Sequence, residues 1–409
     1  MICLVYRTAG EAPAISTEDD TRIKRDMPLK RDTGEFPIAL AGRGWRAPAE
    51  RDAVPVYEKG RGVMAGLLTD SERLVIPDVA MPFPRNRHGD QRAAHELTRE
   101  WALRHSVMPP DLVEQYLDDL RYTDLIGGYY VGAPLPVLTA INDFSLWFFV
   151  WDDRHDRDIR LRRDAAWARL RDGLHRAMAD PRARPRGTEP LVVAFADCAA
   201  RLRGALSGQW AARFARHFHA TIDAYDQEYR NRVAGRVPTV GQYLALRRLT
   251  FGMWSWIDCL ELAAEYELPD RVYWSGPYQR AALASQEFSA WYNDLHSMPK
   301  EIAAGDFHNL GIVLAEHEGL SVQQAAEQLA IRVAERVTDY RREEYCVRRL
   351  LDNLGADAEL RAGVERCLFN MRNWISSVYW FHYESARYRV ESWADPASPP
   401  YFRGRDQNR

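Results

Sequence analysis

From about Leu74 onward, apolar residues recur every three or four positions, the spacing that places them on one face of an α-helix. Turn signals such as Met-Pro-Pro at 108–110, Gly-Ala-Pro at 132–134 and Leu-Pro-Asp at 268–270 interrupt this pattern. The sequence has no convincing alternating strands and no repeat of solenoid length. It therefore predicts an all-α domain, with helices over 91–105, 110–121, 136–155, 162–179, 191–203, 208–232, 239–265, 276–301, 321–352 and 358–387.

The N-terminal part of the chain has a different character. It is rich in proline, glycine and mixed charge and has no sustained hydrophobic period. It reads as a flexible extension, or as sequence upstream of a true start near Met64. Its apolar run is too short for a signal peptide, and the long uncharged run between Asp124 and Asp143 is broken by glycines and prolines, so we expect no membrane span. The predicted organisation is an extension over 1–70, a helical domain over 71–402 and a tail over 403–409.

Composition and charge narrow the class of protein further. The 409 residues are 46% apolar and 28% charged, which excludes disorder as the overall state. With 58 acidic and 55 basic residues there is no basic excess, so we expect no nucleic-acid partner. The five cysteines are odd in number and widely spaced, which favours a reducing, cytoplasmic location.

One cation stands out in this composition. Only four of the basic residues are lysines, and Lys300 is the only one after residue 59. A chain that otherwise uses arginine, yet keeps lysine here, suggests that a compact ammonium group is needed, for example as a point charge on a phosphate. Chance codon usage is the alternative.

The segment W-F-F-V-W-D-D-R-H-D at 147–156 runs from apolar residues directly into acids. Asp152 and Asp156 are one helical turn apart, so their carboxylates share a face of the predicted helix. Like charges at this spacing repel unless a cation lies between them, and Mg2+ prefers such oxygen ligands. We expect both to bind metal, with Asp153 in an outer position or paired with an arginine. The alternative is a solvated acidic helix end, which the abrupt change from apolar to acidic residues disfavours.

A second stripe of polar residues lies in N-D-L-H-S-M-P-K-E at 293–301. Asn293, Ser297 and Glu301 follow one another at intervals of four, so they share one face of a predicted helix. Their amide, hydroxyl and carboxylate oxygens are suited to one Mg2+ that keeps phosphate and water in its other positions. A stripe that faces solvent is the alternative, but aromatic residues precede these ligands as they precede the first motif.

These two motifs, D-D-x-x-D and N-D-x-x-S-x-x-x-E, resemble the paired magnesium motifs of the bacterial class I terpene synthases, or terpene cyclases. The likeness runs from about Leu74 to Tyr401. Long segments carry it, among them R-F-A-R-H-F-H, L-R-R-L-T-F, Q-E-F-S-A-W-Y-N-D-L and N-M-R-N-W-I-S-S-V-Y-W-F-H. The chain departs from the family pattern near the pocket, at Gly252, Met253 and His296. The resemblance implies an α-helical bundle around a central active-site cavity.

The resemblance also implies a reaction and further site residues. It implies farnesyl diphosphate as substrate, three Mg2+ ions as cofactors, a sesquiterpene hydrocarbon as product and antibiotic-type terpenoid biosynthesis as the setting. It assigns diphosphate binding to Arg247 in L-R-R-L-T-F, with Thr250 and Phe251 as the positions where ionisation is induced. It assigns the same role to Arg387 and Tyr388 in E-S-A-R-Y-R-V. A monomer and a homodimer are both compatible with the sequence.

The implied carbocation needs a cavity from which water is excluded. Aromatic faces stabilise a cation by about 0.5–2 kcal/mol each without reacting with it. Phe148 and Phe149 lie one turn before Asp152, so they should project below the metals. For each ring, ordinary core packing is the alternative. The expected wall consists of Phe148, Phe149, Phe251, Trp256, Trp374 and Phe381.

Two other classes of protein share part of this pattern. A chain-elongating prenyltransferase is also all-α and magnesium-dependent, but it uses two D-D-x-x-D motifs, and the other acidic pairs here lack an acid at the fourth position. A non-catalytic helical binding protein would not need an intact ligand set.

His217 and His219 are two residues apart on a predicted helix, so they cannot chelate together. His155 and His382 are expected to form hydrogen bonds near the site.

Overall fold

The computed structural model describes residues 74–182 and 189–388, and every regular element in these ranges is helical. The predicted all-α fold class is confirmed for this part of the chain. The predicted extension over 1–70, the tail over 403–409 and the last part of the predicted domain lie outside the described residues. The helices are α2 (Gln91–Arg104), α3 (Pro110–Glu114), α4 (Tyr122–Tyr129), α5 (Leu135–Arg160), α6 (Asp164–Ala179), α7 (Pro190–Arg203), α8 (Gly208–Val233), α9 (Val240–Thr250), α10 (Met253–Ala263), α11 (Asp270–Tyr273), α12 (Gly276–Ala304), α13 (Leu310–Glu318), α14 (Val322–Asn353) and α15 (Ala358–Glu384), with a π-helical turn η1 (Gln115–Asp119) and a 3-10 turn η2 (Ala386–Tyr388).

Three segments that were predicted as single helices are divided or end earlier in the structure, so these predictions are wrong in that respect. The predicted helix 239–265 is interrupted at Gly252, which has a φ of 69° and separates α9 from α10. The predicted helix 358–387 ends at Glu384, because Ser385 takes an extended conformation before η2 begins. The predicted helix 110–121 consists of α3 and the turn η1.

Two helices of the core were not predicted. α13 is a nine-residue segment whose first six residues are all buried, and so short an apolar run has no readable period. α4 contains two adjacent glycines, which weaken a helical pattern. Gly128 is nevertheless required, because a Cβ atom there would lie 1.7 Å from the hydroxyl oxygen of Ser377 on α15.

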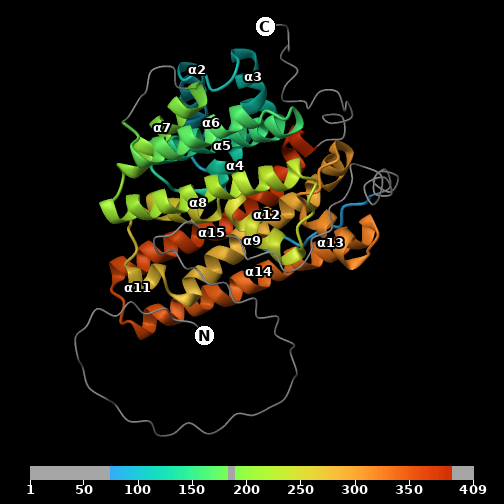
Figure 1. The fold of residues 1–409 in the computed structure, drawn as a ribbon. Helices are drawn as coiled ribbons and strands as arrows, with labels where there is room; N and C mark the ends of the chain where they lie inside the picture. Colours follow the sequence, from blue (N-terminus) through green and yellow to red (C-terminus); the bar gives the residue numbers. More distant parts are fainter. Residues whose placement is uncertain (1–73, 183–188, 389–409) are drawn as a thin grey trace, which may run out of the picture. The chain divides into compact units, whose positions relative to one another are not determined.

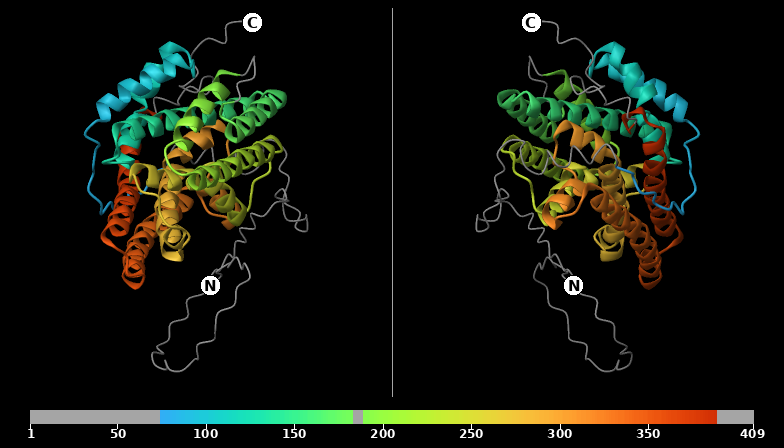
Figure 2. Two further views of the ribbon diagram at one scale, coloured as in Figure 1. Left: turned by 90° about the vertical axis from the view of Figure 1, so that its left-hand side faces the viewer. Right: turned by 90° about the vertical axis from the view of Figure 1, so that its right-hand side faces the viewer.

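α5 and α12 carry the two motifs and lie inside the helical assembly. α5 packs against α2, α4 and α7, whereas α12 packs against α14 and α15 (Figure 1). In the side views most of the green ribbon lies in the upper half of the described part and the red helix α15 lies lower, at one edge, while part of the orange ribbon lies among the green helices (Figure 2). Both α5 and α12 are buried around almost their whole circumference before the ligands begin, which is typical of central helices. The motifs therefore come from opposite sides of one interior.

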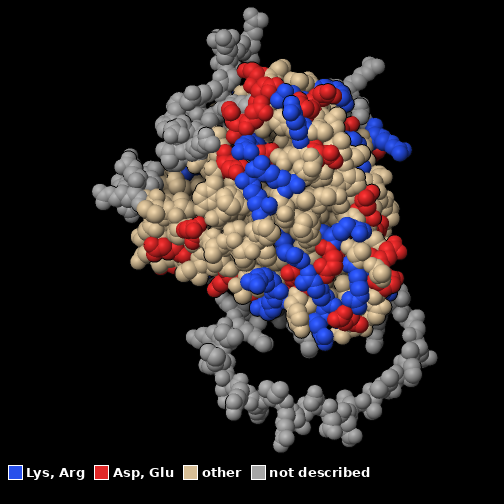
Figure 3. All heavy atoms as spheres, turned by 180° about the vertical axis from the view of Figure 1, so that it is seen from behind, with Lys and Arg blue, Asp and Glu red and all other residues tan. Residues whose placement is uncertain are grey.

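The surface of the described part carries charges of both signs. Basic and acidic side chains are interspersed on the face drawn in Figure 3, with wide areas of uncharged residues between them. None of the described helices combines the length and the apolar character needed to cross a membrane.

Candidate active site

The turn η2 connects the two motifs. One guanidinium nitrogen of Arg387 lies 3.6 Å from Asp152 and the other lies 3.5 Å from Asp153, both on α5. The next residue, Tyr388, accepts a hydrogen bond of 2.7 Å through its hydroxyl oxygen from Nδ2 of Asn293 on α12. Two adjacent residues of one short turn thus reach both predicted metal motifs.

The first motif is bound to α8 on its other side. The hydroxyl of Tyr225 donates a hydrogen bond of 2.9 Å to Asp152. Asp156 forms an ion pair of 2.6 Å with Arg232, which is paired at the same distance with Asp306. To bind a metal ion, Asp156 would have to share its carboxylate between the metal and Arg232 or break this ion pair. Arg232 could not be singled out from the sequence, because its contact with Asp156 depends on the packing of α8 against α5.

The second motif is supported by a residue beyond the end of α12. Asn309 donates hydrogen bonds through Nδ2 to Glu301, at 2.6 Å, and to the hydroxyl oxygen of Ser297, at 3.3 Å. Asn309 lies outside the motif and was not among the residues predicted for the site. Pro299 lies inside α12 and lacks the N–H that would continue the backbone ladder, just before Lys300 and Glu301.

Each motif also contains a buried aspartate that binds an arginine. Asp294 forms an ion pair of 2.7 Å with Arg247 and accepts a hydrogen bond of 2.7 Å from the hydroxyl of Tyr243. Asp153 has the corresponding surroundings, since Tyr116 donates a hydrogen bond of 2.5 Å to it and Arg387 lies beside it. Asp294 was not singled out from the sequence, although its place directly after Asn293 matches that of Asp153 after Asp152.

The electrostatics of the site favour the binding of a cation. Burial, and then the charge of Asp156, raise the pKa of Asp152 to about 7. Burial raises the pKa of Glu301 to about 8 against the opposing charge of Lys300. Burial also raises the pKa of Asp153. For Asp156, Arg232, His155 and Lys300 together outweigh burial and lower the pKa. Crowded carboxyls that resist ionisation, together with hard oxygen donors, fit a divalent metal.

The predicted diphosphate ligands gather around these acids. Arg247 contacts Asn293 at 2.9 Å as well as Asp294, and Arg387 contacts Asp152 and Asp153. Lys300 lowers the pKa of Asp153, Asp156 and Glu301 through its charge, which places its ammonium group near both motifs. The basic residues therefore stand next to the predicted metal ligands.

Part of the predicted aromatic wall forms one cluster. The ring of Phe148 lies 5.6 Å from that of Trp256 and 6.0 Å from that of Tyr225. The indole N–H of Trp256 donates a hydrogen bond of 3.0 Å to the carbonyl of Phe251. Phe149 instead stacks on Tyr122, with ring centroids 3.8 Å apart.

The other two rings of the predicted wall lie on α15. Phe381 packs 5.9 Å from Tyr388, so it lies beside the turn η2. Trp374 is fully buried against Tyr129 and Tyr130 on the α4 side. The role of all these rings as a cavity wall stays a prediction.

The histidines have ordinary partners. His217 contacts Asp258 at 2.7 Å, whereas His219 contacts His175 at 2.8 Å. The two side chains therefore point to different neighbours, as their spacing predicted. His155 lies 3.1 Å from the carbonyl of Tyr225. His382 stacks against Tyr388, with centroids 4.1 Å apart.

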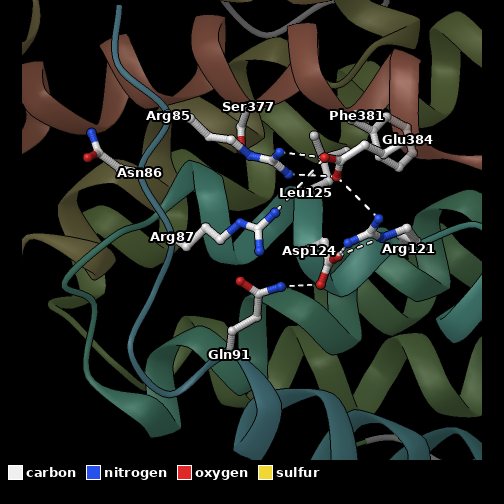
Figure 4. Close-up of a pocket in the computed structure, with 10 residues that line it drawn as sticks. All are labelled: Arg85, Asn86, Arg87, Gln91, Arg121, Asp124, Leu125, Ser377, Phe381 and Glu384. Atoms are coloured by element: carbon white, nitrogen blue, oxygen red, sulfur yellow. Dashed lines mark hydrogen bonds and ion pairs between the residues drawn. The ribbon is translucent and has the colours of Figure 1, made fainter.

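A group of arginines holds the end of α15, immediately before η2. Glu384 is bound through both carboxylate oxygens by Arg85, from the segment that precedes α2, and it also pairs with Arg121 at 3.2 Å (Figure 4). Arg121 binds Asp124 on α4 as well. Ser385 follows and donates a hydrogen bond of 2.9 Å to the carbonyl of Leu120. These contacts fix the point from which η2 extends toward the motifs.

Comparison with known proteins bears on this arrangement. Residues 143–339 match the family model described as terpene synthase family 2, C-terminal metal binding. Epi-isozizaene synthase of Streptomyces coelicolor is 51% identical over 332 residues, which are 80% of this chain and 92% of that protein. The chain belongs to the bacterial class I terpene synthases. It is a carbon–oxygen lyase that acts on prenyl diphosphates, and within the family it is a sesquiterpene cyclase.

More distant members of the family agree in fold. Pristinol synthase of Streptomyces pristinaespiralis is 27% identical over 76% of this chain and 84% of its own length. The crystal structure of germacradien-4-ol synthase from Streptomyces citricolor matches with a TM-score of 0.66 and 21% identity, over 75% of this chain and 98% of that one. Because the identity to germacradien-4-ol synthase is only 21%, this likeness shows the fold alone. The metal-binding domain of the family indicates that this terpene synthase uses a divalent metal.

Proposed function

We propose that this sesquiterpene cyclase converts farnesyl diphosphate to a polycyclic hydrocarbon, epi-isozizaene or a relative of it, with release of diphosphate. The identity of 51% to epi-isozizaene synthase supports the substrate and the class of product. The observation that carries the mechanism is the position of η2, whose Arg387 and Tyr388 contact α5 and α12.

In this proposal the basic residues bind the leaving group. Arg247, Lys300, Arg387 and the hydroxyl of Tyr388 form charge-assisted hydrogen bonds to the diphosphate oxygens as the allylic carbon–oxygen bond breaks. Arg387 and Arg247 are already oriented by Asp153 and Asp294. Such preorganised charge stabilises the developing anion without a protein nucleophile.

The metal ligands proposed are Asp152 and Asp156 from the first motif and Asn293, Ser297 and Glu301 from the second, with three Mg2+ ions as the full complement. When bound, Mg2+ supplies the positive charge that neutralises diphosphate. The raised pKa values of Asp152 and Glu301 support this assignment, because a bound cation would stabilise the ionised carboxylates that burial disfavours.

The aromatic residues act on the other half of the substrate. The faces of Phe148, Phe251 and Trp256 would stabilise successive carbocations, and the rings exclude water that would quench them. Phe149, Phe381 and Trp374 complete the proposed wall. The final cation loses a proton, which the released diphosphate can accept, to give the hydrocarbon.

The direct test is incubation with farnesyl diphosphate and Mg2+, followed by gas chromatography and mass spectrometry of the extract. We expect a cyclic sesquiterpene as the main product. A parallel incubation with added isopentenyl diphosphate should yield no longer prenyl diphosphate. Elongation without cyclisation would contradict the proposal and favour a prenyltransferase.

A second test addresses the metal ligands. Asp152→Asn and Glu301→Gln should each raise the barrier by about 3 kcal/mol or more, roughly a hundredfold in turnover. Near-normal activity in both variants would exclude these residues as metal ligands.

A further inference from the structure

Asn309 joins the end of the second metal motif to the next helix. Its side chain is completely buried and it is the N-cap residue of α13. Its Oδ1 accepts hydrogen bonds from the backbone N–H of Gly311, at 2.8 Å, and of Ile312, at 3.4 Å. Because backbone N–H groups only donate, the amide must present its oxygen to α13. Its NH2 group must therefore point the other way, toward α12.

The NH2 group meets three acceptors on the second motif. Nδ2 lies 2.6 Å from Oε2 of Glu301, 2.6 Å from the backbone carbonyl of Asp294 and 3.3 Å from the hydroxyl oxygen of Ser297. Two of these three residues are proposed metal ligands. A donor directed at Oε2 holds the carboxylate of Glu301 in one orientation, with Oε1 as the oxygen that Asn309 does not engage.

We propose that Asn309 is a positioning residue for the metal site: its amide fixes the side chains of Glu301 and Ser297 in the geometry that binds Mg2+. This inference rests on the proposed function, because it takes both residues as metal ligands. Partners that orient metal ligands change metal affinity by about 10–100-fold when they are removed. The same amide also connects the ligands rigidly to α13 through its cap.

A purely structural role as helix cap would predict a different outcome, and two substitutions separate the two roles. Asn309→Asp keeps the shape and an acceptor that can cap α13, but it replaces the NH2 group by a carboxylate oxygen facing Glu301. Asn309→Ser also keeps a capping oxygen, remains uncharged and is too short to donate to Glu301 in the same way.

The experiment is a calorimetric titration of the full-length protein with Mg2+ in the presence of inorganic diphosphate, with melting temperatures measured without metal. We expect both variants to bind Mg2+ about 10–100-fold more weakly than the wild type. Asn309→Ser should melt close to the wild type, and its products from farnesyl diphosphate should be unchanged at saturating Mg2+. Wild-type Mg2+ affinity in both variants would overturn the inference.

Glu301→Gln serves as the control on the metal site itself. If Glu301→Gln weakens Mg2+ binding and the Asn309 variants do not, only the role of Asn309 is wrong. If Glu301→Gln binds Mg2+ normally, the proposed metal site is wrong. If Asn309→Ser melts at a lower temperature than the wild type, the Mg2+ affinity of the double variant Asn309→Ser/Glu301→Gln distinguishes the two roles. A residue that acts through Glu301 adds little to the loss already caused by Glu301→Gln, whereas an independent structural effect adds in full.

Discussion

Asp153 and Asp294 occupy corresponding places in their motifs, each directly after a proposed metal ligand, and each binds an arginine and a tyrosine from elsewhere in the chain. Successive residues of a helix are rotated by about 100°, so neighbours face different surroundings. The first residue of each pair, Asp152 or Asn293, can therefore face the proposed metals while the aspartate that follows it holds an arginine. This arrangement places Arg387 and Arg247, the proposed diphosphate-binding arginines, beside the proposed metal ligands.

The residues around the diphosphate and those around the hydrocarbon should be separable by substitution. Truncation of Phe148 to alanine removes a ring that packs on Trp256 and opens space about the size of a benzene molecule. We expect Phe148→Ala to consume farnesyl diphosphate but to form a different main hydrocarbon. Lys300→Ala should instead turn over more slowly with the same products, as gas chromatography and mass spectrometry would show. An unchanged product from Phe148→Ala would mean that this ring is ordinary core.

The affinity for Mg2+ should depend on pH. The pKa values of about 7 for Asp152 and about 8 for Glu301 mean that the folded, metal-free protein holds protons that the unfolded chain has released. These groups therefore stabilise the metal-free fold fully only below about pH 4, and this stability is lost progressively as the pH rises from there to about 8. Because Mg2+ needs ionised carboxylates, its affinity should rise over the same range.

This pH dependence can be measured in two ways. Calorimetric titration at pH 6.0 and 8.0, in buffers of different ionisation enthalpy, should show proton release on Mg2+ binding at the lower pH. Melting temperatures in the presence of a chelator should fall more between these pH values for the wild type than for the double variant Asp152→Asn/Glu301→Gln. An equal fall in melting temperature in both proteins would show that these carboxyls are not the titrating groups.

At the scale of elements, the break between α9 and α10 lies between Arg247, a proposed diphosphate ligand, and the aromatic cluster proposed to face the hydrocarbon. Gly252 adopts the left-handed conformation there, and a Cβ atom at this position would lie 3.2–3.3 Å from Phe148 and Trp256. The absence of a side chain thus lets both rings approach the backbone. Arg247, at the end of α9, lies within one turn of this break.

Gly252→Ala should therefore affect both stability and product. The left-handed conformation costs a residue with Cβ about 1–2 kcal/mol, and the added methyl group should displace the ring of Phe148. Gly319→Ala is a matched control, because its φ of 66° is similar but nothing lies within 4 Å of the added Cβ. Both variants should melt at lower temperature, and only Gly252→Ala should change the hydrocarbon profile.

The sequence predicts the long helices well and the connections poorly. α5 and α12 are long and strongly patterned, so their period identifies them and their motifs together. The helix break at Gly252 depends on one backbone angle, and a glycine inside an apolar pattern does not reveal that angle. α13 lacks a readable period because its first six residues are all buried. The hydrophobic period identifies a helix that is buried on one side only, so a helix that is buried on all sides is not recognised from it.

At the scale of the whole molecule, the N-terminal residues outside the described ranges should be dispensable. Their sequence lacks the apolar period needed for a core. The first described residues are by contrast anchored, since Val75 exchanges two hydrogen bonds with Gln323 on α14. We expect a chain that starts at Met64 to retain the turnover of the full-length protein with farnesyl diphosphate. A large loss of activity would show that the extension contributes to the site.

The candidate site could be predicted where it follows the helical period and not where it depends on tertiary contacts. Asp152, Asn293, Ser297 and Glu301 share helix faces that can be read along the chain. Asn309 and Arg232 become relevant only once α12, α13 and α8 are packed together. A single sequence contains no distances between such helices, so these supporting residues had no local signal.

The pairing of Arg85 with Glu384 joins residues 299 positions apart and lies directly before the turn that reaches both motifs. During synthesis on a ribosome, most helices of this fold emerge and can pack before Glu384 has been translated. Arg387 and Tyr388 cannot take their places until that late, long-range contact forms, and contacts of such high sequence separation form slowly. Ionising activity would therefore be the last property that a nascent chain acquires. An incomplete chain would carry both motifs without the turn that joins them, so a premature stop before Arg387 would remove two of the proposed diphosphate-binding residues.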